Sequence, residues 1–172
     1  MKIVLTGEPG IGKTTIIKKV AEVLGDKAIG FYTEEFRDIH GKREGFKIIT
    51  LDGKEGILAS KKLISLYRIG SYGVNLKEFE DLVLPVLEKA KSQDKIVIID
   101  EIGKMELFSE KFARLIDEIF SLGKDIIATV PLKNVHPVIS RIKRNPEVHL
   151  IEVNFSNRDK LPEQIIKVFE KE

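Results

Sequence analysis

Eight residues near the start of the sequence have the types and spacing needed to bind phosphate groups through the backbone. They are Gly7, Glu8, Pro9, Gly10, Ile11, Gly12, Lys13 and Thr14, in the pattern G-x-x-x-x-G-K-[S/T]. Glycines let such a loop approach phosphates closely, so that successive backbone N–H groups point at them. We expect Lys13 to act in catalysis by reaching the β- and γ-phosphates. Thr14 should bind Mg²⁺, which prefers hard oxygen ligands, and the adjacent Thr15 completes the predicted binding loop.

A second pair of candidate residues follows the apolar run that ends at Ile99. Asp100 stands at the end of this run, where a carboxylate can hold a metal ion beside a bound triphosphate. We therefore predict Thr14 and Asp100 as the residues that hold Mg²⁺. Glu101 comes next and could orient a water molecule and accept its proton. This role makes Glu101 the second predicted catalytic residue, and it favours water as the acceptor of the terminal phosphate.

Other polar residues are weaker candidates for the same site. Glu106 should open the next helix, where an acid suits the helix dipole. Lys104 could bind phosphate or pair with a neighbouring acid. Thr129 could bind the attacking water or the γ-phosphate, although threonine is also a common strand residue. An arginine could stabilise the developing charge, and we expect those after the last strands to be best placed. The candidates are Arg37, Arg43, Arg114, Arg141, Arg144 and Arg158, of which Arg141 and Arg144 follow these strands.

The elements that must position these residues follow from the apolar pattern. It predicts strands over 2–6, 28–34, 95–100, 125–130 and 148–153, and helices over 13–24, 106–122, 135–144 and 161–169. Asn75 should cap a further helix toward Ala90, which Pro85 should kink or divide in two. A β-meander within about 30–60 should extend one edge of the sheet, although it could instead form a flap near the nucleotide. The alternation predicts an α/β fold, with a mostly parallel sheet and helices on both faces.

Composition limits the classes of protein that the chain can represent. Its 172 residues suit a single domain, with 42% hydrophobic residues to form a core. We expect no membrane span or signal peptide, and therefore a cytoplasmic protein. The absence of cysteine excludes disulfides and cysteine-based zinc sites, and a net charge of +2 makes nucleic-acid binding unlikely. Abundant Lys and Glu with few Gln residues are typical of proteins from hot environments. We favour a monomer.

The sequence resembles one family over nearly its whole length. The similarity lies in the phosphate loop, "DEIGKMEL" (100–107), "GFYTEEFRD" (30–38), "GFKIITLDG" (45–53), "YGVN" (72–75) and "NRDKLP" (157–162). These stretches look like the small nucleoside-triphosphatases of hyperthermophilic archaea and bacteria, whose human member is called cancer-related nucleoside-triphosphatase. The chain departs from this family at Asn75, where the family has Asp.

The resemblance implies a RecA-like variation of the P-loop NTPase domain. It also implies slow, Mg²⁺-dependent hydrolysis of ATP, GTP, CTP and UTP to the diphosphates. The nucleotide-contacting segments of the family correspond here to the phosphate loop and to Val97, Ile98, Ile99, Asp100, Glu101, Ile102, Gly103 and Lys104.

Three other functions remain open from the sequence. A small nucleoside or nucleotide kinase would need a lid rich in arginine, and seven arginines are spread along this chain. A GTPase switch would match D-x-x-G at Asp100 to Gly103, but the guanine-reading N-K-x-D is absent. An RNA-associated ATPase would use the modest basic run of Lys133, His136, Arg141, Lys143 and Arg144, which is more simply a solvated surface.

Overall fold

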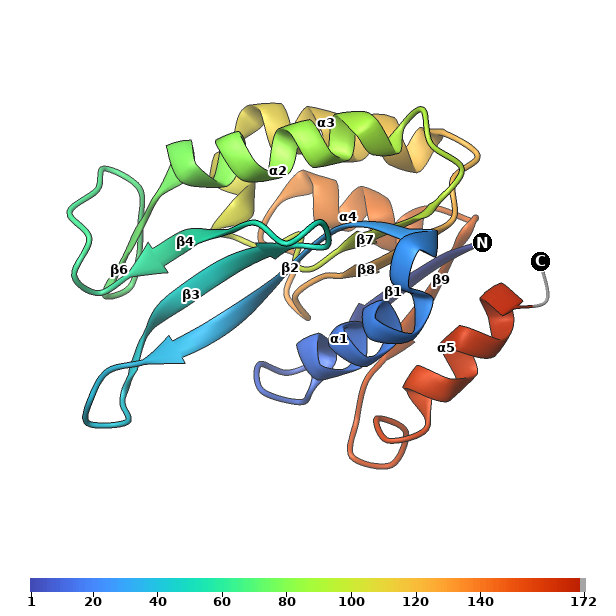
Figure 1. Cartoon of the computed structure of the whole chain (residues 1–172), viewed down its shortest axis with the longest axis horizontal. Helices are drawn as coiled ribbons and strands as arrows, with labels where there is room; N and C mark the ends of the chain where they lie inside the picture. The colour runs from blue at the N-terminus through green and yellow to red at the C-terminus, as the bar shows by residue number, and fades with distance from the viewer. Residues whose placement is uncertain (171–172) are drawn as a thin grey trace.

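The computed structural model describes residues 1–170, which form a mixed sheet with helices on both faces (Figure 1). The strands are β1 (Lys2–Thr6), β2 (Ala28–Arg37), β3 (Arg43–Thr50), β4 (Glu55–Ser60), β5 (Arg68–Ile69), β6 (Tyr72–Val74), β7 (Ile96–Ile99), β8 (Ile126–Thr129) and β9 (Val148–Glu152). The α-helices are α1 (Lys13–Leu24), α2 (Leu76–Ala90), α3 (Glu110–Ser121), α4 (Pro137–Arg144) and α5 (Leu161–Glu170). Short 3₁₀ turns occupy η1 (Gly25–Lys27) and η2 (Glu106–Phe108).

Five parallel strands form the part of the sheet that carries the predicted site. In the order β5-β6-β4-β3-β2-β7-β8-β1-β9, the strands from β2 to β9 run parallel. β8 lies between β1 and β7, with Val4 opposite Ala128 and Ala128 opposite Ile99. The phosphate loop, Asp100 and Thr129 therefore emerge at one edge of the sheet, because parallel strands end on the same side. The predicted α/β class with a mostly parallel sheet is confirmed.

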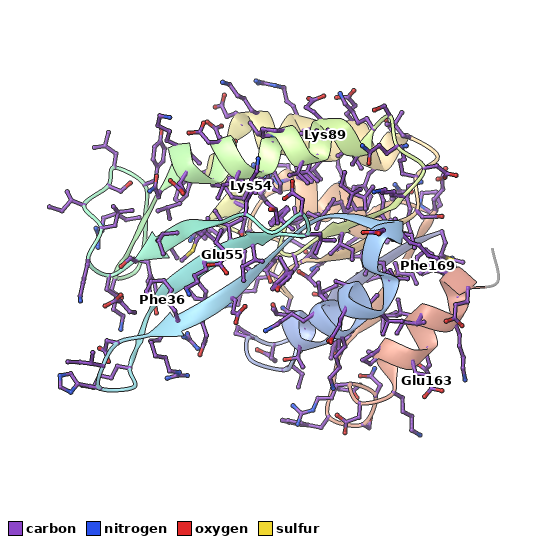
Figure 2. All side chains as sticks on the ribbon, viewed as in Figure 1. Phe36, Lys54, Glu55, Lys89, Glu163 and Phe169 are labelled. Carbon is purple, nitrogen blue, oxygen red and sulfur yellow. The ribbon has the colours of Figure 1, made fainter. Side chains whose placement is uncertain are left out.

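Two apolar cores hold the helices against the sheet. α2, α3 and α4 pack on one face, while α1 and α5 pack on the other (Figure 1). In the first core, the rings of Phe31, Phe79 and Phe112 meet edge to face, with centroids 5.0 to 6.2 Å apart. In the second, Phe169 of α5 is buried, whereas Glu163 of the same helix is exposed (Figure 2). This amphipathic pattern explains why the sequence predicted these helices.

The meander extends the sheet, as expected. β3 and β4 continue the sheet antiparallel beyond β2, and β6 and β5 follow at the edge. β2 runs three residues further than the predicted end at 34, because its distal part pairs with β3 as far as Arg37 opposite Arg43. The length of β2 is thus set by its pairing with β3, which cannot be read from the residues of β2 alone.

Gly30 allows β2 to lie close to β7. Its φ of 139° is one that residues with a side chain rarely adopt, and a Cβ there would overlap the carbonyl group of Ile98. Glycine is therefore required at this position. The close approach holds β2 against β7, which Asp100 directly follows. The backbone N–H of Asp100 donates to the carbonyl of Phe31 over 3.2 Å.

Of the two outcomes expected for Pro85, a kink or a division into two helices, the structure excludes the second. α2 is a single helix from Leu76 to Ala90 with Pro85 inside it. Pro85 is exposed, so water can satisfy the carbonyl that loses its partner. The predicted cap is confirmed, since Asn75 accepts a hydrogen bond from the N–H of Glu78 over 3.1 Å.

The helix expected over 106–122 is divided at Ser109. Its hydroxyl oxygen accepts from the N–H of Phe112 over 3.0 Å and thereby caps α3. The hydroxyl also donates to Glu80 of the neighbouring α2. A stronger N-terminal cap thus starts the helix four residues later than the apolar pattern indicated.

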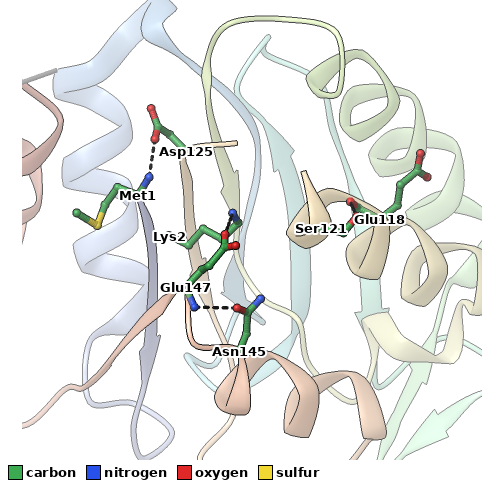
Figure 3. A network of polar contacts seen from close by, with 7 residues as sticks. All are labelled: Met1, Lys2, Glu118, Ser121, Asp125, Asn145 and Glu147. Atoms are coloured by element: carbon green, nitrogen blue, oxygen red, sulfur yellow. Dashed lines mark hydrogen bonds and ion pairs between the residues drawn. The ribbon is translucent and has the colours of Figure 1, made fainter. Parts of the chain in front are cut away.

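Polar contacts fix the opposite edge of the parallel strands (Figure 3). The amino group of Met1 donates to Asp125 over 2.8 Å, next to the start of β8. Lys2, which is 4% exposed, pairs with Glu147 over 3.0 Å, just before β9. These two ion pairs tie β1 to both of its neighbours at the end remote from the phosphate loop.

Candidate functional site

The phosphate loop lies between β1 and α1, as its motif requires. Gly10 and Gly12 have φ values of 79° and 115°, which favour glycine. The N–H of Ile11 donates to the carbonyl of Glu8 over 3.2 Å and closes the turn. The loop leads directly into the first turn of α1, whose unpaired N–H groups and dipole attract anions. The predicted loop is therefore confirmed as a strand–loop–helix unit.

Two threonines hold the carboxylate of Asp100. Thr14 donates its hydroxyl to Oδ2 of Asp100 over 2.9 Å, and Thr129 donates to Oδ1 over 2.6 Å. The N–H of Thr33 approaches Oδ2 at 3.5 Å. Burial raises the pKa of Asp100, which is 1% exposed, while these hydrogen bonds and the charge of Lys13 lower it. Three strands and α1 thus converge on one carboxylate.

Glu101 faces the lysine of the phosphate loop. Its Oε2 lies 3.7 Å from Nζ of Lys13, and its side chain is 30% exposed. The same ammonium group donates to the carbonyl of Gly7 over 2.8 Å, which folds Lys13 back over its own loop. Burial raises the pKa of Glu101, Lys13 opposes this shift, and the charge of Asp100 adds to it. A carboxyl with a raised pKa is suited to accept a proton near neutral pH.

Glu106 belongs to the same acidic cluster, although the sequence ranked it as a weak candidate. Its side chain is 4% exposed, and burial raises its pKa well above the ordinary value. The charge of Glu101 adds to the shift, while the backbone N–H groups of Glu106 and Gly103 oppose it. Glu106 does not open a long helix but lies in η2, so the dipole argument does not apply. The spacing of apolar residues does not reveal that an acid in a 3₁₀ turn is buried. The burial of Glu106 was therefore hard to predict from the sequence.

The remaining candidates separate into those at the site and those away from it. The side chains of Val97, Ile98, Ile99 and Ile102 are fully buried in the cores, so they position the acids. Lys104 is exposed, and within residues 1–170 it forms no ion pair with Glu101 or Glu106. From the sequence, Thr129 could have been either a site residue or an ordinary strand residue; in the structure it contacts Asp100.

Two of the arginine candidates have contacts that bear on the site. Arg141 forms two hydrogen bonds with Asp117 of α3, at 2.7 and 3.2 Å, so it is engaged away from the phosphate loop. Arg158 instead contacts the loop and donates to the carbonyl of Ile11 over 3.2 Å. The expectation that Arg141 would be among the best placed is not supported, because the turn of α4 directs its side chain toward α3.

The residues present fit a magnesium ion better than a transition metal. Among residues 1–170, no group of three or more His, Cys, Asp or Glu side chains is arranged to hold a metal. Thr14 and Asp100 instead offer adjacent hard oxygens. Mg²⁺ is commonly bound through one or two carboxylates and substrate phosphates while it keeps several waters.

None of the helices within residues 1–170 has the length and apolar character that a membrane-spanning helix needs.

Comparison with known proteins gives consistent results. The profile of a family described as NTPase matches residues 2–166. The chain is 49% identical to nucleoside-triphosphatase THEP1 of Aquifex aeolicus, with 99% of this chain and 100% of the relative covered. It is 38% identical to the human cancer-related nucleoside-triphosphatase, with 95% and 94% covered.

Solved structures show the same similarity in three dimensions. The crystal structure of THEP1 from Aquifex aeolicus superimposes with a TM-score of 0.92, covering 99% of both chains. The solution structure of the human protein gives a TM-score of 0.83 and covers 99% of this chain and 97% of that one. The fold class predicted from the sequence, including its likeness to P-loop NTPases, is thus confirmed.

Proposed function

Since the chain belongs to the NTPase family, we propose that it hydrolyses nucleoside triphosphates to the diphosphate and phosphate. The relatives named above are nucleoside-triphosphatases, and they match this chain along nearly its full length. The observation that carries the mechanism is the approach of Glu101 to Lys13, at 3.7 Å. A partly exposed carboxylate beside the lysine of the phosphate loop can act on water at the terminal phosphate.

The loop and Lys13 bind the triphosphate. Backbone N–H groups of the loop and of the first turn of α1 point toward the bound phosphates. Lys13 leaves its contacts with Gly7 and Glu101 to meet the β- and γ-phosphates. This exchange replaces one anionic partner of the ammonium by another, so the charge stays compensated.

Glu101 then acts on water. Once Lys13 turns to the phosphates, the freed carboxylate can orient a water molecule in line with the bond that breaks. It accepts the proton of this water as the oxygen attacks the γ-phosphorus and the bond to the β-phosphate oxygen breaks. General-base catalysis of this kind contributes about 10²- to 10⁴-fold to a rate.

Thr14 and Asp100 are the residues that would hold Mg²⁺. The ion would neutralise charge on the β- and γ-phosphate oxygens when bound. Thr129 fixes the orientation of Asp100 through its 2.6 Å hydrogen bond. Loss of a hydrogen-bond partner that orients a metal ligand typically costs about 10- to 100-fold in metal affinity or activity.

The test is to follow the fate of the terminal phosphate. Purified protein is supplied with γ-labelled ATP, with and without Mg²⁺, and with a panel of nucleosides and monophosphates as rival acceptors. We expect label in free phosphate only, and only when Mg²⁺ is present. Label in a new nucleotide would show a kinase and overturn the proposal.

Other properties stay predictions. We expect ATP, GTP, CTP and UTP all to be accepted, because no N-K-x-D element for reading guanine is present in the sequence. A single domain over residues 1–172, a monomer and a cytoplasmic location are further predictions of this kind. RNA-stimulated turnover that is lost with salt would revive the nucleic-acid alternative.

A further inference from the structure

A loop that follows β9 lies directly against the phosphate loop. β9 pairs with β1 in parallel, so both loops emerge at the same edge of the sheet. The carbonyl oxygen of Val153 would lie only 3.0 Å from a Cβ at Gly7. On the far side of the phosphate loop, Arg158 donates to Ile11. The segment 154–158 therefore borders the place where a nucleotide must lie.

This loop carries an aromatic ring that the fold does not use. Phe155 is 77% exposed, in contrast to Phe31, Phe79 and Phe112 in the core. The guanidinium of Arg158 covers one side of the ring, with its Cζ 4.7 Å from the centroid. The contact of Arg158 with the phosphate loop thus also fixes the ring beside that loop, and the rest of the ring is open.

The backbone around the ring is held rigidly. Oδ1 of Asn154 accepts from the N–H and hydroxyl of Ser156 and from the N–H of Asn157, at 2.7 to 2.9 Å. Asn157 returns the contact: its Oδ1 accepts from the N–H of Asn154, and its Nδ2 donates to the carbonyl of Glu152. The oxygen of Asn154 and both polar atoms of the Asn157 amide are thus engaged in shaping the loop.

We propose that the open side of Phe155 is the stacking platform for the base of the bound nucleotide. This inference rests on the proposed function, because it assumes that a nucleoside triphosphate occupies the phosphate loop. Every base has a π-face, so stacking on an aromatic ring is tolerant of base identity. A platform that binds by stacking on a ring accepts purines and pyrimidines alike. The loop leads into the "NRDKLP" stretch (157–162), to which the phosphate chemistry assigns no role.

Fluorescence tests the platform without relying on hydrolysis. The sequence contains no tryptophan, so Phe155→Trp introduces a single reporter at the proposed contact. We expect ATP, GTP, CTP and UTP each to quench it at saturation. Inorganic tripolyphosphate, which fills the phosphate loop but has no base, should leave the emission nearly unchanged.

Kinetics supply the second measurement. Phe155→Ala should raise KM for all four nucleotides on the order of tenfold, in keeping with the loss of one stacking contact, while kcat stays nearly unchanged. The inhibition constant of tripolyphosphate should not move. Tyr67→Ala is the matched control, because it removes a 41% exposed ring next to β5, at the other end of the sheet from β9.

The outcomes separate the two proposals. Unchanged KM values in Phe155→Ala, or equal quenching of the tryptophan by tripolyphosphate, would overturn the platform. Quenching by the nucleotides but not by tripolyphosphate, without any release of phosphate, would support the platform. The same result would refute the proposed hydrolysis.

Discussion

The ammonium group of Lys13 lies 3.7 Å from the carboxylate of Glu101, so the two predicted catalytic residues contact each other across the loop. A triphosphate must break this ion pair to bind Lys13. On the proposed mechanism, binding of substrate therefore also frees the carboxylate of Glu101 to act on water. In this mechanism Glu101 becomes free to act as general base only when a triphosphate occupies the phosphate loop.

Lys13→Ala should abolish productive binding of triphosphates. The substitution removes the charge that the β- and γ-phosphates require and leaves Glu101 without its cation. Equilibrium binding of a slowly hydrolysed ATP analogue measures the loss. Lys19→Ala, on the exposed side of the same helix, is the control and should bind normally. Normal binding by Lys13→Ala would contradict the role assigned to this residue.

Glu101→Gln should keep nucleotide binding and lower kcat by about a hundredfold or more. The amide retains the size of the side chain but cannot accept a proton from water. Phosphate release and analogue binding are measured side by side. Glu22→Gln, an exposed glutamate on α1, controls for loss of charge. A normal rate in Glu101→Gln would exclude this residue as the general base.

Thr129→Val should raise the Mg²⁺ concentration for half-maximal activity on the order of tenfold, because Asp100 loses a partner that orients it. It should also lower the stability of the fold by about 1 to 3 kcal/mol, since a buried acceptor loses a hydrogen bond. Activity is titrated with Mg²⁺, and unfolding is followed in urea.

Thr6→Val is the matched control for stability. Its hydroxyl is likewise buried near a strand end but is the one buried side-chain polar atom in residues 1–170 that forms no hydrogen bond. The control should therefore be neutral or stabilising. Equal effects of the two substitutions on stability would show that the contact between Thr129 and Asp100 contributes nothing.

Glu106→Gln should stabilise the protein increasingly as the pH rises. The folded state raises the pKa of Glu106 above its ordinary value of 4.5, so the folded chain holds a proton that the unfolded chain releases. Stability of the wild type therefore falls as the pH rises from about 4.5 to the folded pKa. Glutamine does not ionise, so the variant avoids this loss, which grows by about 1.4 kcal/mol with each pH unit across that range.

Urea unfolding at about pH 4 and about pH 8 checks this prediction. The variant and the wild type should differ little at the lower pH and clearly at the higher. A difference in stability that is the same at both values would show that Glu106 is not held protonated by the fold.

Much of the site could be predicted because its signals are local. The phosphate loop is written in eight consecutive residues, and Asp100 follows directly after a buried strand. The parts that escaped prediction depend on contacts between distant segments. Glu106 is buried by neighbours that the sequence pattern does not reveal, and Arg158 reaches Ile11 across 147 positions of the chain. The start of α3 was misplaced because Ser109 caps it more strongly than the apolar pattern indicated.

Gly30 cannot be replaced by a residue with a side chain, although scales of amino-acid similarity would rate an exchange to alanine as mild. Even alanine would act as a wedge between β2 and β7, since its methyl group and the Ile98 carbonyl would claim the same space. Such a wedge would displace the carbonyl of Phe31, which accepts a hydrogen bond from the N–H of Asp100, and with it the acid itself. A seemingly harmless exchange at the third residue of β2 would thus abolish activity by misaligning Asp100.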